Sequence, residues 1–254
     1  MADHPLSIAF VWHMHQPYYK DDLTGAYILP WVRMHGIKDY YDMPALLAGF
    51  PAIHQTFNLV PSLLKQILDY VENNAIDKFL DVTRKRAEAL GHDEKLFLLK
   101  NSFMANWETM IRPYPAYWML LDRRGRSASP RDLENASRYF TARDYRDLQV
   151  WFNLTWFDPL FKQNDPLVKG LIEKGSNFTE EEKLLLIDKQ REVMGLIIPE
   201  YRKLAAEGRI ELTTRPSTIP SCRSCGTRTW RAWPSRTSAC RSSASPIPRT
   251  RRRR

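Results

Sequence analysis

The first 214 residues contain no cysteine, and the chain has no long uninterrupted run of apolar residues. Without a run of about 18 apolar residues, the sequence offers no candidate for a membrane-spanning helix. Without cysteine, this part of the chain has no disulfide and no thiolate ligand for a metal. The N-terminal residues also lack the basic, apolar and small-residue regions of a signal peptide, so we expect a cytoplasmic protein.

Acidic residues are missing from residues 215–254, which contain 11 arginines, eight serines and all three cysteines. The other 214 residues hold 27 Lys and Arg against 29 Asp and Glu, so their net charge is −2, whereas the whole chain carries +9. The arginine-rich segment has few large apolar residues and no periodic pattern, so we expect it to be disordered. We therefore divide the chain into a near-neutral, aromatic-rich body, residues 1–214, and a basic tail, residues 215–254.

Apolar segments of two kinds alternate along the body. The predicted strands are residues 7–12 with a continuation to residue 16, residues 55–60 and residues 209–214. The predicted helices are residues 62–71, 77–90, 93–111 and 131–158, and a last helix that Thr179 caps, Pro199 interrupts and Gly208 ends. Strands that alternate with helices favour an α/β fold with a parallel sheet. The helices between the second and third strands then form a large helical insertion.

Two histidines, His13 and His15, lie at the end of the first predicted strand. Residues two apart on a strand share a face, and polar groups at the carboxyl end of a barrel strand line the mouth of an active site. Three nearby residues add further groups: a carboxamide from Gln16, an indole from Trp31 and a third imidazole from His35. These groups suit a sugar, because the C–H face of a sugar stacks on an indole and its hydroxyls need directed hydrogen bonds. The other interpretations are a chance pair, two core histidines, or half of a zinc site without a visible partner cluster.

Several segments together resemble one family. Residues 10–19, Phe-Val-Trp-His-Met-His-Gln-Pro-Tyr-Tyr, resemble the first signature region of glycoside hydrolase family 57, whose members act on α-glucans as α-amylases, 4-α-glucanotransferases, amylopullulanases and branching enzymes. Residues 30–36, 57–62 and 151–159 are similar to the long, amylase-like members, and residues 208–212 resemble the start of the second signature region. The resemblance covers about residues 6–214. It implies the N-terminal part of a seven-stranded (β/α) barrel.

The resemblance also implies roles for individual residues. The predicted substrate-binding residues are His13, His15, Gln16, Trp31, His35 and Glu211. Glu211 matches an acidic residue of the second region that contacts substrate and is not the nucleophile. Retaining glycosidases use two carboxyl groups, and in this family both lie in later signature regions, so no catalytic residue is assigned here. We expect an α-glucan substrate, no cofactor and no metal, and no activity from this chain as it stands.

The second signature region is incomplete after Thr214, where the expected aromatic residue, histidine and proline are absent. The codons that residues 215–226 allow, shifted by two nucleotides, permit Pro-Phe-Tyr-His-Pro-Ile-Leu-Pro-Leu-Leu-Trp, which matches the missing part. We therefore interpret residues 215–254 as an out-of-frame tail that follows the loss of one nucleotide. The alternative is a basic nucleic-acid-binding protein that uses this arginine-rich tail, with Cys222, Cys225 and Cys240 in a zinc or redox motif.

Overall fold

The computed structural model describes residues 7–214 and 228–229. Its sheet has three parallel strands in sequential order, β1 (Val11–Met14), β2 (Gln55–Leu59) and β3 (Ile210–Thr214), and the short strand β4 (Arg228–Thr229) pairs antiparallel with β3. The predicted α/β class and parallel sheet are confirmed, although β1 is shorter than predicted. The described strands form an open sheet, so the barrel stays a prediction.

The helices fall into three groups along the chain. The first group is α1 (Trp31–His35), the π-helix η1 (Gly36–Tyr40), α2 (Asp42–Ala45), η2 (Leu46–Gly49) and α3 (Pro61–Glu72). The second group is α4 (Lys78–Arg84), η3 (Ala87–Ala89), α5 (His92–Asn101), η4 (Trp107–Ile111), α6 (Pro115–Arg124), α7 (Pro130–Ser137), α8 (Ala142–Leu154), α9 (Pro159–Asn164) and α10 (Pro166–Lys174). The third is the single long helix α11 (Glu180–Ala206). None of the described helices is both long and apolar enough to span a membrane.

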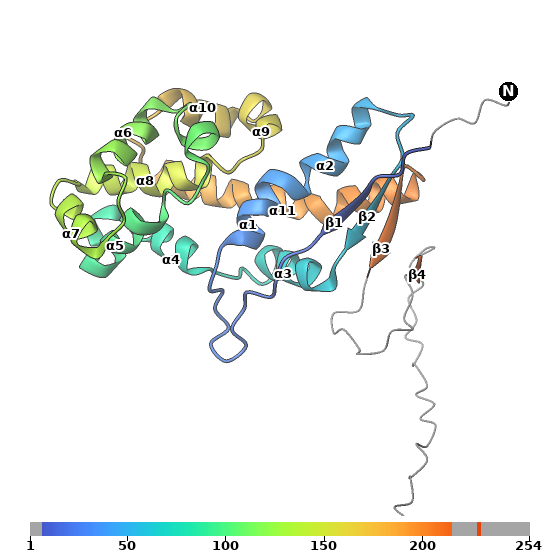
Figure 1. Ribbon diagram of the computed structural model, residues 1–254, viewed down its shortest axis with the longest axis horizontal. Helices are drawn as coiled ribbons and strands as arrows, with labels where there is room; N and C mark the ends of the chain where they lie inside the picture. The colour runs from blue at the N-terminus through green and yellow to red at the C-terminus, as the bar shows by residue number, and fades with distance from the viewer. Residues whose placement is uncertain (1–6, 215–227, 230–254) are drawn as a thin grey trace, which may run out of the picture.

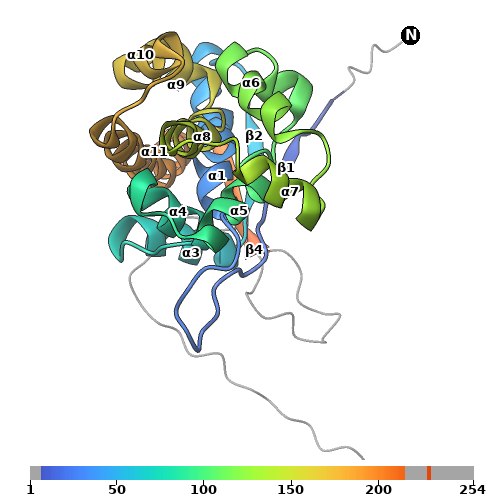
Figure 2. The same ribbon diagram turned by 90° about the vertical axis from the view of Figure 1, so that its left-hand side faces the viewer.

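The second group forms a helical body beside the sheet, and α11 runs from this body to the sheet (Figure 1). In the view turned by 90°, α8 lies among the other helices rather than at their rim (Figure 2). Its last eight residues are all buried, as this central position requires. The predicted helical insertion between the second and third strands is therefore present, and α8 is its centre.

Three predicted helices are each divided in two. Residues 77–90 form α4 and η3, and capping side chains divide the other two. Residues 131–158 form α7 and α8, because the Thr141 side chain accepts a hydrogen bond from the amide of Asp144 and begins a new helix there. Residues 93–111 form α5 and η4, because the Asn106 side chain accepts hydrogen bonds from two amides and restarts the helix. Capping side chains thus mark boundaries that apolar periodicity alone did not indicate.

Pro199 does not interrupt α11, which is continuous from Glu180 to Ala206, so this prediction was wrong. Proline removes one backbone hydrogen bond, but the buried face on both sides of it, including Ile197 and Tyr201, packs against the rest of the protein and compensates the loss. The other two signals are confirmed. Thr179 forms a capping box with Glu182, and Gly208 has a φ of +68° directly after the helix end.

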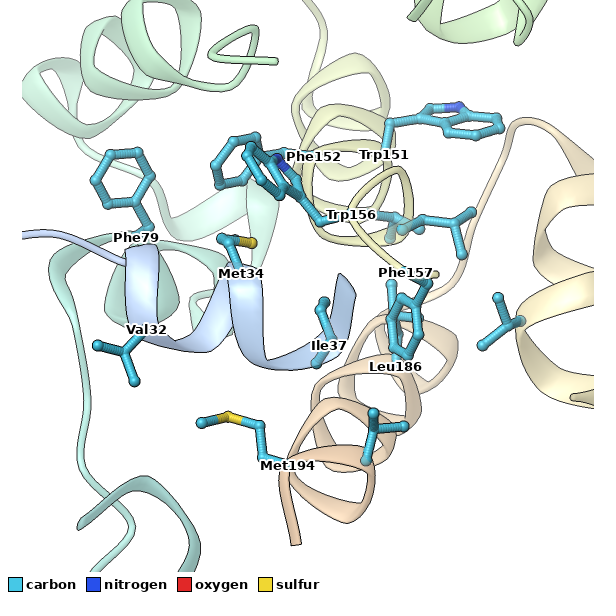
Figure 3. Packing of buried hydrophobic residues seen from close by; sticks show 14 of the residues in the cluster. Val32, Met34, Ile37, Phe79, Trp151, Phe152, Trp156, Phe157, Leu186 and Met194 are labelled. Atoms are coloured by element: carbon cyan, nitrogen blue, oxygen red, sulfur yellow. The ribbon is translucent and has the colours of Figure 1, made fainter. Parts of the chain in front are cut away.

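The hydrophobic core joins the helical body to the sheet. Its close-packed side chains come from α1 and the adjoining η1, from α8 and the loop after it, and from α11 (Figure 3). Phe79 of α4 also belongs to it. The labelled members are Val32, Met34, Ile37, Phe79, Trp151, Phe152, Trp156, Phe157, Leu186 and Met194. At the sheet, Phe57 of β2 meets Tyr201 of α11 edge to face, with ring centroids 5.2 Å apart. α11 therefore covers one face of the sheet, the face that carries Trp12, Phe57 and Leu212 in one row.

Candidate functional site

The opposite face of the sheet carries polar side chains. One row across β1, β2 and β3 consists of His13, Asn58 and Thr213. In the parallel register, His13 pairs with Asn58 and Asn58 pairs with Thr213. The His13 Nδ1 atom lies 2.8 Å from Asn58 Oδ1, and Asn58 Nδ2 donates to Thr213 Oγ1 at 3.0 Å. Each of these residues is the second-last residue of its strand, so the row lies near the carboxyl edge of the sheet.

The two histidines of the first strand lie together, as their spacing predicts. The rings of His13 and His15 are stacked, with centroids 5.5 Å apart and an angle of 8° between the planes. Both side chains are exposed, so the interpretation as two core histidines is wrong. They offer imidazole nitrogens to solvent at the end of β1.

Gln16 is held by two tyrosines. Its Nε2 donates to the Tyr40 hydroxyl at 2.9 Å, and its Oε1 accepts from the Tyr19 hydroxyl at 2.9 Å. The Tyr40 hydroxyl in turn donates to the backbone carbonyl of His15 at 3.2 Å. Burial raises the pKa of Tyr40 to about 12, which keeps this phenol protonated. A carboxamide has two N–H groups and two lone pairs, so Gln16 retains one of each for a ligand in this fixed orientation.

Trp31 and His35 form an aromatic cluster next to Gln16. The centroid of the His35 ring lies 6.4 Å from the ring centroid of Trp31, 6.3 Å from that of Tyr40 and 5.5 Å from that of Trp156. Its Nδ1 contacts Asp39 Oδ2 at 2.5 Å. Burial opposes ionisation of Asp39, but hydrogen bonds from His35 and Lys38 hold the pKa of that carboxyl below its usual value. Tyr40 thereby links the cluster to the strand end, since it contacts both Gln16 and His35.

Glu211 lies on the polar face, one row further from the carboxyl edge. It pairs with Thr56, which pairs with Val11. Its side chain is exposed, and no hydrogen bond or ion pair joins it to another residue in the described ranges. The fold therefore places Glu211 on the same face as His13 without bringing the two into contact.

Three contributors to this site were not predicted from the sequence: Asn58, Thr213 and Tyr40. Asn58 is a polar residue between the apolar Phe57 and Leu59 of a central strand, which is a signal that could have been found. Thr213 and Tyr40 carry no such signal, because their positions depend on strand register and on the path of the chain after β1.

The predicted site residues line neither a metal-binding cluster nor a hollow of the described structure. Among residues 7–214, no group of three or more His, Cys, Asp or Glu side chains could hold a metal ion. Cys222, Cys225 and Cys240 lie outside the described residues. Hollows of about 480 Å³ and about 300 Å³ are lined by other residues than the predicted ones. The candidate site is thus an exposed sheet edge, lined by hydrogen-bonding groups of the kind that sugar hydroxyls need.

Comparison with known protein families gives a match over most of the chain. The profile of the family described as Glycosyl hydrolase family 57 matches residues 9–223, a range that includes all three parallel strands and the helical insertion. No curated protein and no solved structure matches the chain.

Proposed function

The chain belongs to glycosyl hydrolase family 57, and on this premise we propose that it is the N-terminal part of an enzyme that binds and acts on α-glucans such as starch, glycogen or maltooligosaccharides. The observation that carries the proposal is the row of His13, Asn58 and Thr213 at the carboxyl edge of the sheet. Gln16 and the cluster of Trp31 and His35 lie beside it.

The three parallel strands are, in this proposal, the first strands of a (β/α)7 barrel. Parallel strands are normally covered on both faces. α11 covers the apolar face, so the polar face corresponds to the interior of the barrel. The active site of a barrel lies at the carboxyl ends of its strands, which is where the row is found.

The side chains of the row suit the binding of a carbohydrate. An imidazole nitrogen accepts a hydrogen bond from a hydroxyl, while a carboxamide donates and accepts, as sugar hydroxyls do. Trp31 is half-buried and supplies an indole on which the C–H face of a sugar can stack. Glu211, on the same face, would position the substrate rather than attack it.

The reaction itself needs two further carboxyl groups. A retaining mechanism requires a nucleophile and an acid/base about 5–5.5 Å apart, and the resemblance places both beyond the second signature region. We therefore propose that the chain as written binds α-glucan and does not hydrolyse or transfer it. Residues 215–254 are, in this proposal, an out-of-frame tail.

Two measurements test this proposal. Affinity electrophoresis in gels that contain glycogen should retard the chain, whereas gels with a β-linked glucan should not. Equal mobility in both gels would contradict α-glucan binding. Resequencing the gene across codon 214 should reveal a downstream frame that encodes Pro-Phe-Tyr-His-Pro-Ile. The frame-restored protein should hydrolyse or transfer maltooligosaccharides, while the chain as written should show no turnover above a vector control.

The alternative of nucleic-acid binding stays a prediction. The arginines that suggest it fall in residues 215–254, which lie outside the described residues except for Arg228–Thr229. A cytoplasmic location likewise stays a prediction, which cell fractionation can test.

A further inference from the structure

We infer that Asn58 is a positioning residue that holds the His13 imidazole with its proton on Nδ1, so that Nε2 accepts a hydrogen bond from a hydroxyl group of the bound sugar. The role toward the sugar rests on the proposed function, whereas the position of the proton does not. The contact between Asn58 and His13 depends on the parallel register of β1 and β2.

The direction of the hydrogen bonds follows from the Asn58 side chain. Asn58 lies on the central strand and is only 7% exposed, so its amide needs partners within the protein. Its Nδ2 donates to Thr213 Oγ1, which leaves Oδ1 facing His13 Nδ1. A carbonyl oxygen can only accept. The Nδ1 atom of His13 must therefore carry the proton.

The other ring nitrogen is then an acceptor in the neutral imidazole. No hydrogen bond from another described residue reaches His13 Nε2, and the His13 side chain is exposed. Stacking on His15, with an angle of 8° between the rings, limits the tilt of the imidazole. Asn58 and His15 together thus set both the tautomer and the plane of the ring.

The geometry also explains why Thr213 belongs to the row. An amide that had only His13 as a partner could rotate by 180° and present Nδ2 to the ring, which would reverse the tautomer. In the observed orientation Nδ2 donates to Thr213 Oγ1, so rotation of the amide would require this hydrogen bond to reverse its direction as well. Residues 155 positions apart in the chain therefore cooperate to orient one imidazole on a third strand.

The test is the tautomer of His13 in the full chain, measured with ¹⁵N-labelled histidine and long-range ¹H–¹⁵N correlation spectra. His13→Gln identifies the His13 signals by their disappearance. At about pH 8, where an ordinary histidine is neutral, the parent chain should show a protonated Nδ1 and an unprotonated Nε2. A parent chain with the proton on Nε2 would overturn the inference, whether or not any variant folds.

Substitutions then test the cause. Asn58→Leu removes the acceptor and should shift the population toward the Nε2-protonated tautomer, whereas Asn58→Asp keeps an acceptor and should preserve the Nδ1 proton. Thr213→Val should give a partial shift, because the amide can then rotate. Thr56→Val, on the same face of the sheet but one row away, should leave the tautomer unchanged. An unchanged tautomer in both Asn58→Leu and Thr213→Val would contradict the positioning role.

Binding of maltopentaose, measured by calorimetry, connects the tautomer to the proposed function. Asn58→Leu should weaken binding by about tenfold, and Asn58→Asp should recover most of this loss. A parent chain that holds the Nδ1 proton but does not bind maltopentaose would overturn the proposed function alone. A parent chain that binds maltopentaose with the proton on Nε2 would overturn the inference alone.

Discussion

Arg33 and Asp77 form a buried ion pair with two hydrogen bonds. Arg33 Nε donates to Asp77 Oδ2 at 2.8 Å and Nη2 donates to Oδ1 at 3.2 Å, and both residues are almost fully buried. Arg33 Nη1 also donates to Asn153 of α8 and Gln190 of α11, each at 2.7 Å. Asp77 caps α4 by accepting from the amide of Leu80. One guanidinium thus connects α1, α4, α8 and α11.

The first prediction concerns this pair. Arg33→Leu should lower the free energy of unfolding by about 3–5 kcal/mol, because it leaves the buried Asp77 carboxylate without its cation. Urea denaturation at low protein concentration, followed by tryptophan fluorescence, measures the change. The control is Glu108→Gln, which breaks an exposed ion pair with Arg112 and should leave the midpoint nearly unchanged. Equal effects of the two substitutions would contradict the structural role of the pair.

The second prediction concerns pH. Burial, and then the neighbouring carboxylate of Asp158, raise the pKa of Asp42 to about 8. The folded state therefore binds one proton more than the unfolded state between about pH 4 and about pH 8, so Asp42 makes the protein less stable as the pH rises through that window. Asp42→Asn should remove this dependence, and its free energy of unfolding relative to the parent, measured in urea at low protein concentration, should increase from about pH 5 to about pH 8.

Neighbouring groups define the control for this experiment. Asp39 also raises the pKa of Asp42, while burial and then Asp42 itself raise the pKa of Tyr201. Burial lowers the pKa of Lys162, close to Asp158, to about 8, so Lys162 contributes to the pH dependence of stability only above about that pH. Asp188→Asn, at an exposed position of α11, is the matched control. A difference between Asp42→Asn and the parent that does not change with pH would count against the buried carboxyl pair.

The third prediction concerns sugar contacts in the frame-restored enzyme. His13→Ala and His15→Ala should each reduce kcat/KM by a factor that corresponds to about 1–3 kcal/mol, because a sugar hydroxyl loses its partner in a partly dry site. Glu211→Gln should lower kcat/KM without abolishing activity, since its inferred role is positioning. His92→Ala, at an exposed histidine on α5, is the control. Near-parental values for both histidine variants would contradict a role of the pair in sugar binding.

The fourth prediction concerns the outer edge of the sheet. Within the described residues, β1 pairs with β2 alone, and Ile8, Phe10 and Val11 are 70%, 52% and 65% exposed. Unpaired apolar edges promote association between chains, so the chain should bind a hydrophobic dye and scatter light on heating. Val11→Lys should reduce both signals, whereas Leu23→Lys, at a loop residue that is 98% exposed, should not. A parent chain that binds no dye and unfolds in one sharp transition would refute this prediction.

Local signals in the sequence were sufficient for many elements of the fold. Short apolar runs predicted all three parallel strands, and Thr179 and Gly208 marked the two ends of α11. These signals depend on residues within one helical turn or one strand, so they can be recognised without knowledge of distant contacts. The resemblance at residues 10–19 likewise pointed to His13 and His15, which the structure stacks together.

The composition of the site beyond that strand depended on tertiary structure. Asn58 and Thr213 reach His13 only because strands separated by as many as 155 residues pair in one register. The buried Arg33 and the unbroken helix at Pro199 also depend on packing against distant elements. The physical reason is the same in each case. A side chain's hydrogen-bond partners and the compensation of a lost backbone bond are set by neighbours in space, and spacing along the chain does not encode them.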